Sequence, residues 1–165
     1  MVTVLQLIER ARLALGESAA IAAWAVTQGG AGKLLVVQGF APTEAELSQA
    51  PSVTVLPAPC TTDAATGKRR LGVAVECRVR NPGGTAAAGA MLYPATADAL
   101  ALEALVLAAL QTELDQAGLD RPDIQTGYAA GLDPALVLVT LVLTYPVPGL
   151  IGAEYELNPR PEPAP

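Results

Sequence analysis

The stretch RLGVAVECRVR, from Arg70 to Arg80, constrains the fold of this chain more than any other. Apolar side chains occupy every second position and alternate with glycine, alanine or charged residues. Successive side chains of a strand point to opposite faces of a sheet, so the pattern predicts a β-strand with one buried and one exposed face. The exposed face carries Arg70, Glu76, Arg78 and Arg80. Because the chain contains no histidine, these charges favour a role in contacts over a role in proton transfer.

Length and composition predict one folded domain with apolar surface left over. The chain has 165 residues, enough for a domain that buries roughly 70% of the surface its unfolded form exposes. We expect a single α+β domain over residues 1–150 and an extended, proline-rich tail over residues 151–165. Charged residues make up 16% of the chain, against about 25% in average soluble domains. So few charges predict that part of the apolar surface meets a partner.

Three broad classes of protein are disfavoured. The apolar stretch from Met91 to Leu110 is interrupted by Pro94, Asp98 and Glu103, so we expect no membrane span. The N-terminal sequence MVTVLQLIERARLAL has its charges after the apolar start, unlike a secretory signal, which favours a cytoplasmic origin. The net charge of −6 argues against broad nucleic-acid binding, although a local basic patch is compatible with it.

The first fifty residues contain elements of mixed type. Apolar residues at helical spacing predict an amphipathic helix over Thr3–Leu15, ended by Gly16. The segment Ser18–Thr27 is compatible with a short buried helix or a strand, because alanine favours the helix and its larger apolar residues permit either. A β-branched run predicts a strand over Lys33–Phe40, and a capping-box spacing predicts a short helix near Thr43–Gln49.

The alternating strand at Arg70 has a second strand before it. Ser52–Leu56 alternates in the same way, and the Pro-, Thr- and Gly-rich segment Pro59–Arg70 predicts a long hairpin loop that reaches away from the core. We expect this loop to dock on a partner. The pairing predicted for this hairpin places Val55 opposite Cys77 and keeps Cys60 apart from it, so the two cysteines should not form a disulfide.

The second half of the chain predicts a long helix and a central strand. Asn81–Tyr93 resembles a loop, and Pro94–Ala117 predicts the longest helix, with leucines around much of its circumference. Arg121–Leu132 fits a loop or an irregular strand, whereas Ala135–Tyr145 is apolar on both faces, as in a central strand. Together the elements predict an α+β fold, with one mainly antiparallel sheet, the long helix and the N-terminal helix packed on it, and a long β-hairpin loop.

The sequence offers little support for catalysis. The segment GGAGK at Gly29–Lys33 resembles a phosphate-binding loop, but Leu34 stands where a serine or threonine should follow the lysine, so we interpret it as a flexible turn. Without histidine a serine or cysteine triad lacks its usual base, and two isolated cysteines cannot complete a zinc site. We expect no catalytic residue, no cofactor, no metal site and no enzymatic activity.

Arginines and lysines form the main charge cluster. Lys68, Arg69 and Arg70 stand at the return of the hairpin, and Arg78 and Arg80 extend the same strand face. The cluster fits a solvated turn, or a basic finger that contacts an acidic neighbour or DNA inside a channel. For Trp24 and Tyr128 we expect packing in the core.

The order of elements resembles the tail-terminator or tail-completion (neck) proteins of long-tailed bacteriophages. The resemblance covers Val2 to Gly149 and rests on four segments: the helix VLQLIERARLAL, the strand SVTVL with the long loop into RRLGVAVECRVR, the helix ALALEALVLAAL, and the strand ALVLVTLVLTYPVPG. It implies a subunit that closes into a homo-oligomeric ring, usually a hexamer, which caps the tail tube and joins it to the head-side connector. It also implies a virion location after assembly in the host cytoplasm, and it carries over no catalytic residue or cofactor.

These considerations define the interface hypothesis. We expect Lys68, Arg69, Arg70, Arg78 and Arg80 to line the lumen, with possible non-specific contact to DNA, or an interface. On the long helix we expect Leu102, Val106 and Leu110 to contact a neighbouring copy. The main alternative is a small cytoplasmic α+β binding or accessory domain, monomeric or dimeric, without a virion role; a small-molecule enzyme that uses carboxylates is a third.

Overall fold

The computed structural model of the chain describes residues 3–28, 35–38, 51–62, 69–81, 83–92, 94–116, 122–130 and 136–147. Their helices are α1 (Val4–Glu17), α2 (Ala19–Thr27) and α4 (Ala95–Gln116). Their strands are β1 (Leu35–Gln38), β2 (Ser52–Thr62), β3 (Arg69–Arg80), β4 (Thr85–Ala87), β5 (Ala90–Leu92), β6 (Asp123–Ala130) and β7 (Leu136–Val147). The short helix predicted over 43–49 and the predicted tail over 151–165 lie outside the described residues.

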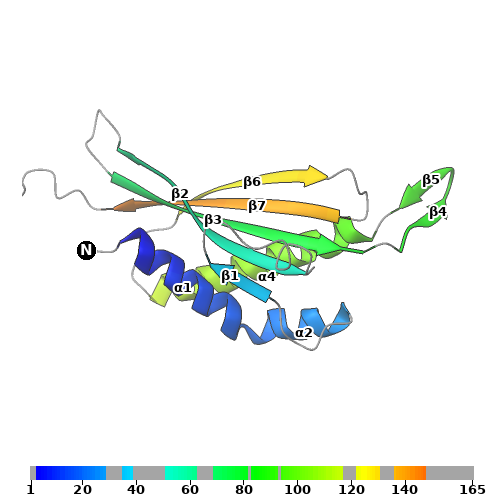
Figure 1. Ribbon diagram of the computed structural model, residues 1–165, viewed down its shortest axis with the longest axis horizontal. Helices are drawn as coiled ribbons and strands as arrows, with labels where there is room; N and C mark the ends of the chain where they lie inside the picture. Colours follow the sequence, from blue (N-terminus) through cyan, green and yellow to red (C-terminus); the bar gives the residue numbers. More distant parts are fainter. Residues whose placement is uncertain are drawn as a thin grey trace, which may run out of the picture.

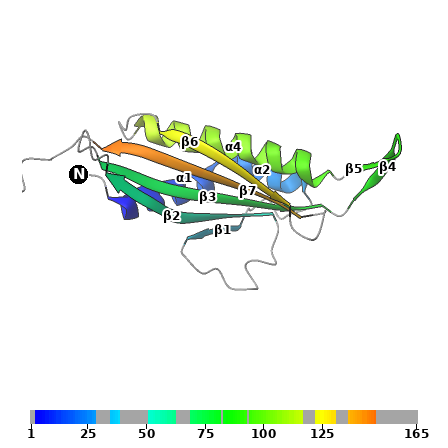
Figure 2. The same ribbon diagram turned by 90° about the horizontal axis from the view of Figure 1, so that it is seen from above.

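Five of the strands form one sheet with the order β1-β2-β3-β7-β6. All neighbouring pairs are antiparallel except β1 and β2, which are parallel. The described helices lie on one face of this sheet (Figure 1), with α1 against β1, β2 and β3 and with α4 against β3 and β7 (Figure 2). The prediction of an α+β fold, with one mainly antiparallel sheet and two helices packed on it, is confirmed.

The N-terminal helices are defined by their capping residues. Thr3 caps α1 through a reciprocal pair, in which the Gln6 backbone N–H donates to Thr3 Oγ1 (3.2 Å) and the Thr3 backbone N–H donates to Gln6 Oε1 (2.9 Å). The predicted end at Gly16 is one residue early, because α1 continues to Glu17. Ser18 then caps α2 by accepting from the Ile21 backbone N–H (3.3 Å), which settles the open question over Ser18–Thr27 in favour of a helix.

The two strands of the β2–β3 hairpin are longer than the sequence analysis predicted, and they include both ends of the predicted loop. Pro59–Thr62 belongs to β2 and Arg69 already belongs to β3, so the predicted loop is wrong at both ends; residues 63–68 lie outside the described part of the chain. Val53, and not Val55, stands opposite Cys77. Because the error is two residues from Ser52 to Ala58, these side chains keep their predicted face of the sheet; the register then shifts between Ala58 and Thr61.

A second hairpin occupies most of the segment that was predicted to be a loop, 81–93. Strands β4 and β5 pair around Ala88 and Gly89, whose positive φ angles of 49° and 80° form the tight turn. We call residues 83–92 the arm. Both views show the arm extending away from the five-stranded sheet and the helices (Figures 1 and 2).

The C-terminal strands form the other half of the sheet. The central strand predicted over Ala135–Tyr145 is confirmed as β7, which pairs with β3 on one side and β6 on the other. The segment 121–132, for which a loop or an irregular strand was predicted, contains the regular strand β6. Among the described strands, β6 forms one edge of the sheet and β1 forms the opposite edge.

The core lies between the helices and one face of the sheet. The apolar positions of the alternating strand are buried as predicted: Leu71, Val73, Val75, Cys77 and Val79. They pack with every second residue of β7 and with the inner sides of α1 and α4, in a cluster that also includes the partly buried Trp24. The core packing expected for Trp24 is thus confirmed in part.

Part of α4 has the dimensions of a membrane span. The segment Ala95–Glu113 is long and apolar enough to cross a bilayer by length and composition, although the sequence had suggested that its acidic residues exclude this. A helix that packs in a protein core meets the same criteria. In the structure one side of α4 lies on β3 and β7.

Candidate interaction surface

The polar face of β3 is the sheet face opposite the one on which the described helices pack (Figure 1). Arg70, Glu76 and Arg78 alternate with the buried residues of β3, so the predicted placement of these charges on one face is confirmed. Arg80 is exposed and continues the same alternation. Side chains at every second position of a strand stand about 7 Å apart, so Arg78 and Arg80 are close neighbours along this face.

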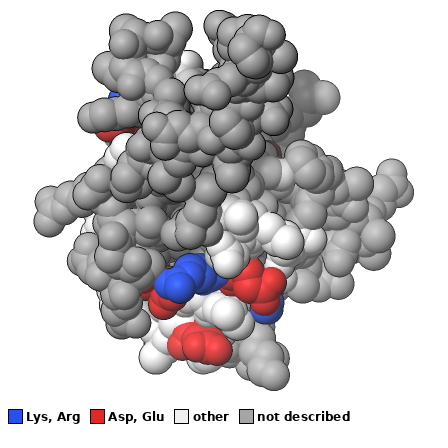
Figure 3. Space-filling model, turned by 90° about the vertical axis from the view of Figure 1, so that its left-hand side faces the viewer, with Lys and Arg blue, Asp and Glu red and all other residues white. Residues whose placement is uncertain are grey.

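The basic cluster predicted at the hairpin is partly neutralised. Arg70 forms an ion pair with Asp123 on β6, with 2.6 Å between Nη1 and Oδ2. The sheet creates this contact, because β7 lies between the two strands and pairs with both. Lys68 and the side chain of Arg69 lie outside the described part of the structure. At this end of the molecule the described acidic and basic side chains lie next to one another (Figure 3).

The predicted contact residues of the long helix are core residues. Leu102, Val106 and Leu110 are 0%, 0% and 3% exposed, so the role assigned to them in contacts with a neighbouring copy is wrong for this conformation. The prediction failed because leucines surround α4, and the sequence does not tell which side faces the sheet. The outward side carries other apolar residues, among them Leu100, Ala101, Ala104 and Ala108.

Strand β6 is the most exposed strand of the sheet. Its described side chains, from Asp123 to Ala129, are all exposed, including Ile124 at 38% and Tyr128 at 61%. The core position expected for Tyr128 is therefore wrong. Together with Leu100 of α4, which is 46% exposed, this strand forms a surface that we call the β6 edge.

One carboxylate ties the β6 edge to α4. Glu103 accepts from the Tyr128 hydroxyl at Oε2 (3.1 Å) and from Thr126 Oγ1 at Oε1 (3.4 Å). The hydrogen bond to the Glu103 carboxylate favours the protonated phenol and raises the pKa of Tyr128. The two hydrogen bonds fix α4 relative to the strand without covering the strand's outer edge.

A polar cluster holds the base of the arm. Asp98, in the first turn of α4, accepts from Asn81 Nδ2 (2.8 Å) and from Gln28 Nε2 (3.3 Å). The Asn81 side chain also accepts from the Gly83 backbone N–H through Oδ1 (3.1 Å). These contacts link α2, the end of β3 and the start of α4 at the point where the arm leaves the domain.

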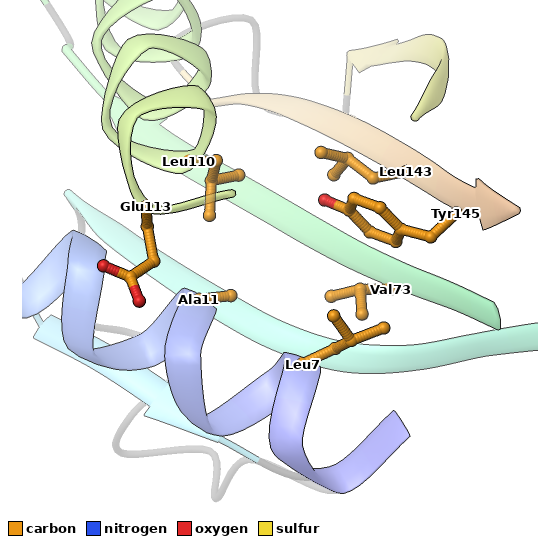
Figure 4. A pocket seen from close by; sticks show the side chains of 7 residues that line it. All are labelled: Leu7, Ala11, Val73, Leu110, Glu113, Leu143 and Tyr145. Atoms are coloured by element: carbon orange, nitrogen blue, oxygen red, sulfur yellow. The ribbon is translucent and has the colours of Figure 1, made fainter. Parts of the chain in front are cut away.

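The described residues offer no ready site for chemistry. They contain no group of three or more histidine, cysteine, aspartate or glutamate side chains placed to hold a metal ion. A cavity of about 10 Å³ lies between α1, α4 and the sheet (Figure 4), at the lower limit of what one water molecule requires. Its lining is apolar except for Glu113 and the hydroxyl of Tyr145, whose pKa is raised by burial.

The two cysteines differ in their surroundings. Both are free thiols, as predicted, with Cys60 exposed and Cys77 buried. Burial, with a smaller contribution from the charge of Glu103, raises the pKa of Cys77 from 9.0 to about 12. A thiol that is protonated at neutral pH and enclosed in the core is a poor nucleophile, so Cys77 is a packing residue.

Known proteins add no family assignment: no protein-family model matches the chain, and no curated protein matches it.

Proposed function

We propose that the chain is a structural subunit of a bacteriophage virion, a tail terminator or neck protein that assembles into a ring at the head-proximal end of the tail. The order of helices and strands from which the resemblance was drawn supports the proposal. The observation that carries it is the β6 edge, where apolar side chains are exposed beside a strand that pairs, among the described strands, with β7 alone. Such a surface is suited to a repeated contact between copies.

A ring requires two different surfaces on each subunit. When the contact surface differs from the surface it meets, each copy adds to the last by the same rotation until the circle closes. The β6 edge and the arm are two such surfaces, one along the side of the sheet and one beyond its end (Figure 1). Six copies are the number that the resemblance implies.

The polar sheet face, opposite the described helices, supplies a candidate lining for the lumen. It carries Arg78 and Arg80, with Glu76 beside them. In this proposal the face contacts passing DNA through its phosphates and without sequence preference. The upper and lower surfaces of the ring then contact the tail tube and the head-side connector.

Assembly of the purified full-length chain tests the proposal. Native mass spectrometry over a range of protein concentrations gives the number of copies, and negative-stain imaging gives the shape of the assembly. We expect closed rings, most simply of six copies, alone or when tail tubes are added. A compact monomer under all these conditions would refute the ring and favour the small binding domain. A closed dimer would have the same consequence.

A further inference from the structure

We infer that the arm of one copy docks on the β6 edge of the next copy and adds a strand to its sheet. The inference rests on the proposed ring, because it identifies the two surfaces that make the repeated contact. We call the β6 edge the acceptor of this contact and the arm its donor. The structure of a single copy shows both segments and the direction in which the arm points.

The acceptor is an edge strand without the usual protection. Natural edge strands avoid pairing with other chains by means of lysine, proline, bulges or short length. The sequence of β6, DIQTGYAA, contains neither lysine nor proline. It pairs with β7 without a register shift from Asp123 to Ala130. Its outer backbone groups therefore form a regular row that can accept another strand.

Apolar side chains lie beside the outer backbone groups of β6. Ile124 and Tyr128 stand opposite Leu143 and Val139, which are buried beneath the helices, so both point to the helix side of the sheet. Leu100 is exposed on α4, the helix that holds Tyr128 through Glu103. A strand added at the β6 edge would cover part of this apolar surface.

The donor is a hairpin whose two strands pair with each other and, among the described helices and strands, pack on no other element to a comparable extent. An isolated two-stranded hairpin is marginal in water and becomes stable when it joins a third strand or packs on a helix. The sequence of the arm, GGTAAAGAML, carries no charge, so a neighbouring sheet can cover it without burying an ion. The described side chains of Thr85, Ala86 and Ala88 are exposed.

The base of the arm sets its direction before any partner binds. Asn81 is held by Asp98 and in turn holds the Gly83 backbone N–H. A contact whose geometry is fixed in the free protein costs less ordering entropy on binding. Because the arm points away from its own sheet, its natural acceptor is the sheet of another copy (Figures 1 and 2).

A contact between arm and β6 edge also explains why the assembly closes into a ring. Two β6 strands related by a two-fold axis would form a dimer and leave both arms uncovered. The arm and the β6 edge are different surfaces, so pairing one with the other covers both and repeats by rotation.

A lysine at the centre of β6 tests the acceptor. A Cβ at Gly127 would lie 4.0 Å from the Thr140 carbonyl oxygen, an ordinary contact, so the strand has room for the substitution Gly127→Lys at this atom. The matched control is Gly16→Lys on α1, which changes the charge equally and meets nothing within 4 Å. In wild-type and control protein we expect rings; in Gly127→Lys we expect the dissociation constant between copies to rise about tenfold or more. Sedimentation velocity measures this, and circular dichroism confirms that both variants fold.

The turn of the arm tests the donor. Gly89 has a φ of 80°, which a β-branched residue tolerates poorly, so Gly89→Val should distort the arm and weaken assembly. At the neighbouring position Ala88 has a φ of 49°, which asparagine accepts readily, so Ala88→Asn should preserve assembly. Equal assembly by the two variants would overturn the role of the arm.

Cross-linking between two differently labelled copies identifies the segment that binds at the β6 edge. In a Cys60→Ser background, Ala86→Cys marks the arm and Gly127→Cys marks the β6 edge. A short bis-maleimide should join the two variants in a mixture and should join neither variant to itself. Self-linking of Gly127→Cys alone would indicate two-fold pairing of β6 and overturn the inference, as would rings that give no cross-link.

The outcomes separate the two proposals. Rings that persist in Gly127→Lys refute the arm contact and leave the proposed function intact. A wild-type chain that stays monomeric, with or without tail tubes, refutes both.

Discussion

Strands β7 and β6 are neighbours in one sheet, yet they differ in almost every respect except their backbone pairing. Val139 and Leu141 of β7 are fully buried, whereas the described side chains of β6 are all exposed. Helix α4 accounts for the difference, because it packs on β3 and β7, whereas its hydrogen bonds to β6 come from Glu103 at the margin of the sheet. Backbone pairing makes both segments strands, but only the cover of a helix makes a strand part of the core.

The largest expected effect concerns the helix that provides this cover. Leu102 is fully buried, so Leu102→Ala should lower the free energy of unfolding by about 2–5 kcal/mol. Leu100, on the same helix but 46% exposed, is the matched control, and Leu100→Ala should cost about 0.5 kcal/mol. Urea unfolding followed by circular dichroism measures both. Equal losses would mean that α4 does not cover β7 in the way described.

Two glycines compare the interior of the sheet with its edge. A Cβ at Gly72 would lie 2.8 Å from Ala58 Cβ and 2.8 Å from the Pro59 carbonyl oxygen, beside the irregular register of β2. Gly72→Ala should therefore destabilise the fold by about 1–3 kcal/mol through overpacking. Gly127→Ala in β6 has room and should be neutral or slightly stabilising, because glycine weakens a strand. A thermal melt that ranks the two variants in the opposite order would contradict this comparison.

Covered elements were predictable because burial leaves a pattern in the sequence. The alternation in β3 and the apolar run in β7 gave the correct strand type and, for β3, the correct buried face. The apolar spacing predicted a helix over Thr3–Leu15, close to the observed α1 at Val4–Glu17 with Thr3 as its cap. Strand β6 carries no such pattern, since its described side chains from Asp123 to Ala129 are exposed on both faces, and its regular geometry comes from pairing with β7. The arm was missed because two short strands of small residues resemble a loop.

The candidate surface was less predictable than the fold. Alternation placed the arginines of β3 on one face, but it could not show that Asp123, far away in sequence, neutralises Arg70. Because α4 has apolar residues around most of its circumference, the sequence does not show which side faces the core. Leu102, Val106 and Leu110 were therefore predicted as contact residues, although Leu100 is the exposed one. Tyr128 was assigned to the core from its size alone. Each error concerns a relation between strands and helices that only the folded chain establishes.

The two cysteines allow a test of the covered face by pH. The pKa of Cys77 is raised by burial from 9.0 to about 12, so the folded state favours the neutral thiol. This contribution to stability is complete below pH 9 and is lost as the pH rises toward 12. At pH 10 the loss should reach about 1.4 kcal/mol.

Cys77→Ala should lose less stability than wild type between pH 8 and pH 10, whereas the exposed Cys60→Ser should match wild type. Thermal unfolding at the two pH values gives the difference, and parallel slopes for all three proteins would show that Cys77 is accessible to water.

The smallest expected effect concerns β2, at the other side of the sheet. Ser52 is buried although it lies on the face away from the described helices, and its Oγ has no hydrogen-bond partner among the described residues. Removing an unsatisfied buried hydroxyl removes its desolvation penalty, so Ser52→Ala should stabilise the fold by up to about 1 kcal/mol. Ser18→Ala makes the same chemical change at the cap of α2 and should instead destabilise it by about 1 kcal/mol. Chemical denaturation of the two variants should therefore give shifts of opposite sign. A loss of stability in Ser52→Ala would mean that its hydroxyl is hydrogen-bonded in solution, and the uncovered face at β2 would then resemble the solvent-exposed β6 more than the dry interior of β7.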